Sequence, residues 1–205
     1  PVLGDFSNAN WGAAWNTTGP VAPLKAAFIQ DVLAQYNVTG KFLMNTEAAL
    51  ICGPNGADPG SDGCEATDDS LYEQTKARYV VQSYTASIAA GLVTNNWFSL
   101  YGWRNSGLLY SNSMARPAYG AYGFARQELQ DASFQQVITS YPNIMAHQFL
   151  RHNRIVWVLW SQDGTTHSIT LPGTPLAVYN FTGDTLIPSV SIDVSLDPIY
   201  LEWYP

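Results

Sequence analysis

Two short, nearly continuously apolar segments constrain the fold of this 205-residue chain more than any other feature. Residues 42–46 (FLMNT) and 93–100 (VTNNWFSL) each follow a segment with helical periodicity. Apolar runs of this kind are typical of parallel strands that are buried on both faces. The alternation of helix and strand predicts a parallel α/β sheet, but two strands cannot complete one. This region is therefore predicted to be one piece of a larger sheet.

Three helices are predicted around these strands, at Pro23–Tyr36, Ser70–Gly91 and Pro117–Leu129. Two of them begin with proline, which suits the first turn of a helix. The middle helix begins with the sequence SLYE, a capping box in which a hydroxyl and a Glu three residues later bind the free amides of the first turn. In each segment the apolar residues recur at a spacing of three or four.

The hydrophobic period changes to two after Phe134, which predicts a C-terminal region made of strands. The predicted strands recur at regular spacing, and glycines mark several turns between them; the strands are Ile144–Arg151, Ile155–Trp160, Thr166–Leu171, Leu176–Asn180, Val190–Val194 and Ile199–Trp203. Short strands at such spacing are typical of a β-sandwich. We therefore expect an α/β portion in residues 1–131 and a β-sandwich in residues 132–205.

The charge content of the chain excludes several classes of partner. Charged residues make up 12% of the chain, and 16 Asp or Glu against 9 Lys or Arg give a formal net charge of −7 at pH 7. No basic stripe is present to contact phosphates, so nucleic acid and anionic membranes are not predicted partners. No apolar run reaches the roughly 18 residues of a membrane-spanning helix. The start at Pro1 resembles neither a signal peptide nor an initiator Met, so we expect a processed or truncated chain.

Cys52 and Cys64 lie twelve residues apart in a loop that is rich in Gly, Pro and Asp. We predict a disulfide between them, which implies an oxidising, extracellular compartment; two free thiols are the main alternative. Zinc is disfavoured because the three histidines lie far from both cysteines and the paired ligand spacings are absent. Titration of thiols under native, non-reducing conditions checks this prediction, and two reactive thiols would contradict it.

Glu47 differs in context from the other acidic residues, because it ends a strand that is predicted to be buried. In (β/α)8 barrels, catalytic groups lie at the carboxyl ends of strands. A carboxylate in this position is expected to be largely desolvated and therefore paired or functional. The alternative to catalysis is a structural ion pair, with Arg78 or Arg104 as the partner.

Asn45-Thr46-Glu47 at the end of a strand resembles the seventh barrel strand of the retaining glycoside hydrolases of clan A. The resemblance continues through residues 74–82 (QTKARYVVQ) and 96–98 (NWF). Residues 116–122 (RPAYGAY) are similar to the last barrel helix of enzymes whose barrel is followed by a β-sandwich, and residues 197–202 (DPIYLE) resemble the last strand of that sandwich.

The resemblance implies that residues 1–131 are the C-terminal part of a (β/α)8 barrel, with its strands seven and eight. It implies that Glu47 is the nucleophile of a retaining hydrolase that cleaves a β-linked polysaccharide or oligosaccharide. Trp97, Tyr101 and Trp103 are then the candidate sugar platform, because a flat aromatic ring buries the apolar face of a pyranose. Asn45 is a further candidate, through hydrogen bonds to sugar hydroxyls.

The clan's acid/base Glu ends barrel strand four, which this chain lacks. We therefore expect a companion, either a missing N-terminal barrel segment or a separate chain. No cofactor or metal is implied: segment 58–69 partly matches a calcium loop, but its substituted ligands favour a solvated acidic lid. The alternative function is a non-catalytic carbohydrate-binding or structural cell-surface module. A solvent-facing strip formed by Trp157 or Trp160, with Glu47 facing no cleft, would favour that alternative.

Overall fold

The computed structural model describes residues 22–50, 71–102 and 105–205. In these residues the chain forms three helices and ten strands: α1 (Ala22–Gln35), β1 (Asn45–Ala48), α2 (Leu71–Ala89), β2 (Asn95–Trp97), α3 (Pro117–Leu129), β3 (Ser133–Val137), β4 (Ile144–Arg151), β5 (Arg154–Ser161), β6 (His167–Thr170), β7 (Ala177–Asn180), β8 (Thr185–Leu186), β9 (Ser191–Val194) and β10 (Ile199–Trp203). A search of this part of the chain for a helix long and apolar enough to cross a membrane finds none.

The three predicted helices are confirmed, and their ends follow from local chemistry. Helix α3 begins at Pro117, and Arg116 precedes it in an extended conformation. Gly91 follows α2 with a φ of 76°, in the left-handed region that glycine enters without steric cost, and this residue ends the helix.

Strands β1 and β2 pair in parallel, with Asn45 opposite Asn95 and Ala48 opposite Trp97. The sequence places the first strand too early, at residues 42–46, and predicts that it is buried. That prediction is wrong for the described chain, because the side chains of Phe42 and Met44 are 68% and 45% exposed. The physical reason is that, among the described residues, no third strand pairs with β1 or β2 to cover them.

The C-terminal strands form two antiparallel sheets, one with the order β3-β4-β5-β10-β7-β8 and the other with the order β6-β9. The predicted bounds of β4 and β10 are confirmed to the residue. Strands β3 and β8 were not predicted, since β3 is mostly polar and exposed and β8 is two residues long. Buried side chains from both sheets pack against each other; they include Ala146, Leu159, Ile169, Val194 and Leu201.

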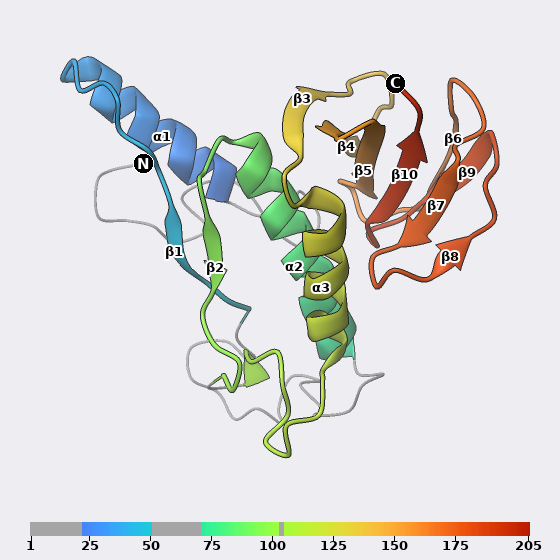
Figure 1. Cartoon of the computed structure of the whole chain (residues 1–205), viewed down its shortest axis with the longest axis horizontal. Coiled ribbons are helices and arrows are strands. Elements are labelled where there is room, and N and C mark those ends of the chain that lie inside the picture. Colours follow the sequence, from blue (N-terminus) through green and yellow to red (C-terminus); the bar gives the residue numbers. More distant parts are fainter. Residues whose placement is uncertain (1–21, 51–70, 103–104) are drawn as a thin grey trace.

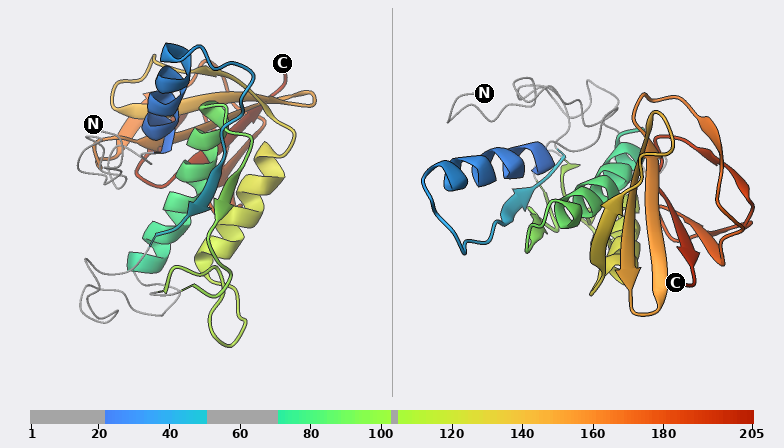
Figure 2. Two further views of the ribbon diagram at one scale, coloured as in Figure 1. Left: turned by 90° about the vertical axis from the view of Figure 1, so that its left-hand side faces the viewer. Right: turned by 90° about the horizontal axis from the view of Figure 1, so that it is seen from above.

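Helices α2 and α3 form a layer between the parallel pair and the larger antiparallel sheet (Figures 1 and 2). One apolar core joins this helical layer to the sheet: Ala77, Val80, Val81, Ala118, Ala121 and Ala125 from the helices pack with Phe149, Val156, Val158, Trp160 and Tyr200. The small alanines let the two helices approach each other and the sheet closely. The larger sheet therefore holds α2 and α3, and these helices in turn support β1 and β2.

His147 on β4 lies in this buried layer beside Trp160, with 5.3 Å between the ring centroids. Burial lowers the pKa of His147 to about 4, so the folded protein holds the imidazole neutral. The unfolded chain binds a proton near pH 6.5, so acidification from pH 6.5 to pH 4 favours unfolding. We expect the free energy of unfolding to fall by about 3 kcal/mol through this residue between pH 7 and pH 4.

A comparison with His147→Phe isolates this effect, which urea denaturation at several pH values measures. Burial and the neighbouring Glu202 raise the pKa of Glu128 to about 7, and this carboxyl stabilises the fold as the pH falls. Since both proteins retain Glu128, its contribution cancels in the comparison. Equal loss of stability on acidification in both proteins would contradict the assignment to His147.

Candidate functional site

The carboxyl ends of β1 and β2 lie side by side, because the strands are parallel and adjacent. The Phe98 backbone amide donates to the Ala48 carbonyl at 2.8 Å, so the pairing continues to the last residue of β1. This geometry brings Glu47, the next-to-last residue of β1, to the same edge as Trp97, the last residue of β2. The sequence prediction that these two residues belong to one site is therefore compatible with the pairing.

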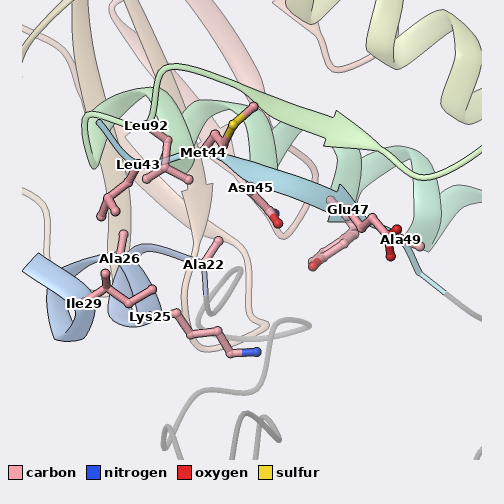
Figure 3. A pocket seen from close by; sticks show the side chains of 12 residues that line it. Ala22, Lys25, Ala26, Ile29, Leu43, Met44, Asn45, Glu47, Ala49 and Leu92 are labelled. Carbon is pink, nitrogen blue, oxygen red and sulfur yellow. The ribbon is translucent and has the colours of Figure 1, made fainter. Parts of the chain in front are cut away.

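A cavity of about 380 Å³ lies between β1 and α1, and both Asn45 and Glu47 line it. Figure 3 shows the two side chains projecting from the same side of β1, as alternate residues of a strand do. Lys25 of α1 and Tyr79 of α2 line the same cavity. A carboxylate, an amide, an ammonium group and a phenol thus surround one space that is open to solvent.

Glu47 itself is exposed, which corrects the expectation of a desolvated carboxylate. The cause is the open side of β1, which no other described strand covers. Among the described residues no ion pair involves Glu47, and Arg78 instead donates to Asp197 at 2.8 Å. Arg104, the other ion-pair candidate, lies outside the described residues. The Arg78 alternative for Glu47 is therefore wrong.

Asn45 is oriented by a chain of side-chain hydrogen bonds. Its Nδ2 donates to Asn95 Oδ1 at 2.8 Å, and Asn95 Nδ2 donates to Ser83 Oγ of α2 at 2.9 Å. Asn95 is buried, so these bonds satisfy an amide that would otherwise be costly in the interior. The chain fixes β1 to β2 and both strands to α2.

Trp97 is half-buried and held at two points. Its Nε1 donates to the Ser106 carbonyl at 2.9 Å, and its ring meets the Tyr79 ring edge-on at a centroid distance of 6.2 Å. Tyr101 is 56% exposed, and its hydroxyl hydrogen-bonds to Ser113 at 2.9 Å. The indole of Trp97 is thus rigid, whereas Tyr101 lies on the surface of the following loop.

Three of the predicted site residues lie outside the described part of the chain. They are Trp103, Cys52 and Cys64, and the predicted disulfide lies there with the two cysteines. Within the described residues, no group of His, Cys, Asp or Glu side chains is arranged to hold a metal ion.

A buried ionic network below the site was not predicted from the sequence. The Glu73 carboxylate binds Lys76 Nζ at 3.0 Å and the guanidinium of Arg116, and all three side chains are buried. The capping-box interpretation of Glu73 did not include this role. A signal was present in the sequence, since Lys76 lies one turn after Glu73 in a helix whose neighbouring positions are mostly uncharged.

This network fixes the loop that follows β2. Lys76 Nζ donates to the carbonyls of Asn105 and Gly107 at 2.7 and 2.9 Å, and Arg116 donates to the Asn105 side chain at 3.2 Å. Ser106, the acceptor for Trp97, lies between the two bound carbonyls. Glu73, Lys76 and Arg116 therefore position the loop that anchors the candidate sugar platform.

Desolvation lowers the pKa of Lys76 to about 8, although the nearby Glu73 carboxylate acts in the opposite direction. The ammonium group remains the form that the network needs, since it donates to two carbonyls and a carboxylate. Because desolvation and the Glu73 carboxylate act on the Lys76 pKa in opposite directions, the charge on Lys76 depends on the charge on Glu73.

No family model matches the chain, and no curated protein matches it. Solved structures do resemble it. A family 39 glycoside hydrolase from Bacteroides cellulosilyticus WH2 has a TM-score of 0.55 and 20% identity, covering 63% of this chain and 30% of its own. A family 30 endoxylanase from Clostridium papyrosolvens C71 has a TM-score of 0.54 and 15% identity, covering 85% of this chain and 45% of its own. A conserved exported protein from Bacteroides fragilis has a TM-score of 0.56 and 11% identity, covering 89% and 43%.

This chain spans less than half the length of each of these structures. At such identities the likeness concerns the fold alone. The arrangement of helices and antiparallel sheets in this chain therefore also occurs within larger glycoside hydrolase structures.

Proposed function

We propose that this chain is the part of a retaining glycoside hydrolase that carries the nucleophile, Glu47. The observation that supports this proposal most strongly is the position of Glu47 at the carboxyl end of β1, open to a cavity and beside the end of β2. Catalytic groups of (β/α)8 barrels lie at this end of their strands. The resemblance of the fold to glycoside hydrolase structures gives independent support.

The proposed mechanism assigns one step to Glu47. Retaining enzymes hold two carboxyl groups about 5 Å apart, one as nucleophile and the other as acid/base. Ionised Glu47 attacks the anomeric carbon and forms a glycosyl–enzyme ester, while the second carboxylic acid protonates the leaving oxygen. Water, deprotonated by that second group, then hydrolyses the ester and releases Glu47. The second carboxyl group belongs to the companion segment, where its pKa is raised so that it is protonated.

Trp97 is the part of this chain best suited to hold the sugar at Glu47. Its ring is fixed by the Ser106 hydrogen bond and the Tyr79 contact, so little entropy is lost when a pyranose packs against it. Tyr101 follows Trp97 in the adjoining loop and extends the platform, and Trp103 stays a candidate for it on the sequence alone. One N–H of Asn45 Nδ2 donates to Asn95, so its second N–H and the side-chain oxygen are left to hydrogen-bond sugar hydroxyls.

The exposed apolar side chains on and around β1 and β2 are the reason that we propose a companion segment. The apolar side chains of Phe42, Met44, Val93, Phe98 and Leu100 are all more than 40% exposed. Side chains of this kind on paired parallel strands are normally covered, and open strand edges promote association. We assign the missing cover to the other strands of a (β/α)8 barrel, with the domain boundary near residue 131.

Sedimentation velocity tests the need for a companion. We expect the isolated 205-residue chain to self-associate, and co-expression with a companion that supplies the other barrel strands to give a 1:1 complex that hydrolyses an aryl β-glycoside. The isolated chain leaves the apolar side chains around β1 and β2 exposed, and self-association buries them. In the complex, the companion covers these side chains instead. A monodisperse monomer with a cooperative thermal transition and no companion would contradict both the barrel assignment and the mechanism.

The condition that would favour a purely carbohydrate-binding or structural module is met only in part. Trp157 lines an open groove on the antiparallel sheet, whereas Trp160 is 1% exposed and belongs to the core, and Glu47 does line a cavity. We place the enzyme outside the cell, in line with the predicted disulfide and with the exported protein among the similar structures.

A further inference from the structure

The larger antiparallel sheet extends beyond the sheet that covers it. Strands β4 and β5 have eight residues each, whereas β6 and β9 have four each. The buried part of the shared face carries Ala146, Leu159 and Leu201. Further along the same face, the sheet formed by β6 and β9 no longer covers the side chains of β4, β5 and β10, and this end of the larger sheet is open to solvent.

A groove of about 270 Å³ occupies this uncovered end of the sheet; Gln148, Ile155, Trp157, Trp203, Tyr204 and the Pro172–Gly173 turn line it. The rings of Trp157 and Trp203 lie 4.5 Å apart at 57° to each other. Both indoles are half-buried and pack against the core, so they form a rigid, angled aromatic surface.

Polar groups in the groove are few and neutral. Trp157 Nε1 donates to Gln148 Oε1 at 3.0 Å, and this bond sets the direction of the amide. Gln136 also donates to Gln148 Oε1, at 3.3 Å, while Gln148 Nε2 has no partner among the described residues. Tyr204 is 63% exposed at the rim, with the Arg154 guanidinium stacked 4.5 Å from its ring centre. None of the lining side chains is charged.

These features define the ligand chemistry. Fixed indole faces favour a flat apolar surface, and a free amide donor favours a hydroxyl or ether oxygen beside it. The lack of lining charge favours a neutral molecule. We infer that the groove binds a neutral β-linked glycan, whose pyranose rings pack on Trp203 and Trp157 while their oxygens accept from Gln148 Nε2.

This site is separate from the cavity at Glu47. On β5, Trp157 alternates with Val156 and Val158, which face helices α2 and α3. Strands β4, β5 and β10, which carry most of the groove residues, and strand β1, which carries Glu47, lie on opposite sides of the layer formed by α2 and α3 (Figures 1 and 2). Binding here holds the chain on a polysaccharide without occupying the catalytic centre, and it does not depend on the proposed reaction.

Isothermal titration calorimetry of the 205-residue chain with xylohexaose and with cellohexaose tests this inference. We expect at least one of these neutral glycans to bind, and Trp203→Ala to weaken that binding about tenfold or more. Gln148→Leu, which keeps the side-chain size and removes the donor, should weaken it less strongly. Tyr119→Ala removes an exposed tyrosine on α3 and serves as the matched control. Near-UV circular dichroism confirms that each variant is folded.

The outcomes separate this site from the catalytic proposal. Binding that Trp203→Ala weakens and Tyr119→Ala leaves unchanged belongs to the groove, and this result stands even if Glu47 fails as a nucleophile. Absence of binding to both glycans would overturn the inference. Binding that Trp97→Ala abolishes and Trp203→Ala leaves unchanged would also overturn it, because the ligand would then occupy the cavity at Glu47.

Discussion

Under the proposed mechanism, replacement of Glu47 by glutamine should abolish turnover by the chain assembled with its proposed companion and leave the fold nearly unchanged. Glutamine has the size of glutamate, and the side chain is exposed with no ion pair among the described residues, so no packing or charge pairing is lost. The amide cannot act as the nucleophile. A loss on the order of 10³-fold or more in kcat is expected for removal of a covalent catalyst.

Hydrolysis of an aryl β-glycoside measures this effect, with Asp31→Asn on the exposed surface of α1 as the control. Azide rescue separates a nucleophile from a structural residue. In Glu47→Ala, azide can enter the space left by the side chain and attack the anomeric carbon, which yields a glycosyl azide of inverted configuration. More than a few per cent of wild-type activity in Glu47→Gln would remove this residue from the mechanism.

The elements that sequence predicted well are those with local causes. Helix α3 is bounded by Pro117 and the end of its apolar stripe, and α2 ends at a glycine with positive φ. Such signals act within a few residues and need no knowledge of the tertiary fold. The pairing of β1 with β2 was predictable for a related reason, because helix–strand alternation leaves parallel pairing as the simple connection.

The features that sequence did not predict depend on distant segments. Glu73 meets Arg116 across 43 residues, and nothing local indicates that contact. Glu128 of α3 is 2% exposed because the larger sheet packs over it, and no local pattern in the helix indicates this burial. The exposure of Glu47 was missed for the opposite reason, since the expected neighbouring strands are absent from the described residues. Burial at these positions is a property of the whole fold.

Replacement of Glu73 by glutamine should strongly destabilise the protein, because it removes the carboxylate that binds two buried cations. The variant leaves Lys76, with no exposed side-chain surface, and Arg116, with 7%, without their shared carboxylate. Breaking a buried ion pair by removing one partner costs about 3–5 kcal/mol. Urea denaturation at pH 7 measures this loss, and Glu47→Gln, the same substitution at an exposed site, should change stability by less than about 0.5 kcal/mol.

The penalty should also shrink as the pH rises, because Lys76 can release its proton. Desolvation already lowers the Lys76 pKa to about 8, and loss of the Glu73 charge removes an interaction that raises it. A charged lysine whose pKa is lower in the folded than in the unfolded protein destabilises the fold. This destabilisation decreases as the pH rises above the folded pKa. The difference between wild type and Glu73→Gln is therefore expected to be smaller at pH 9 than at pH 7. Since Lys76 positions the loop that accepts the Trp97 hydrogen bond, the Trp97 fluorescence should shift in the same variant. A pH-independent difference between the two proteins would show that Arg116, rather than Lys76, carries the unpaired charge.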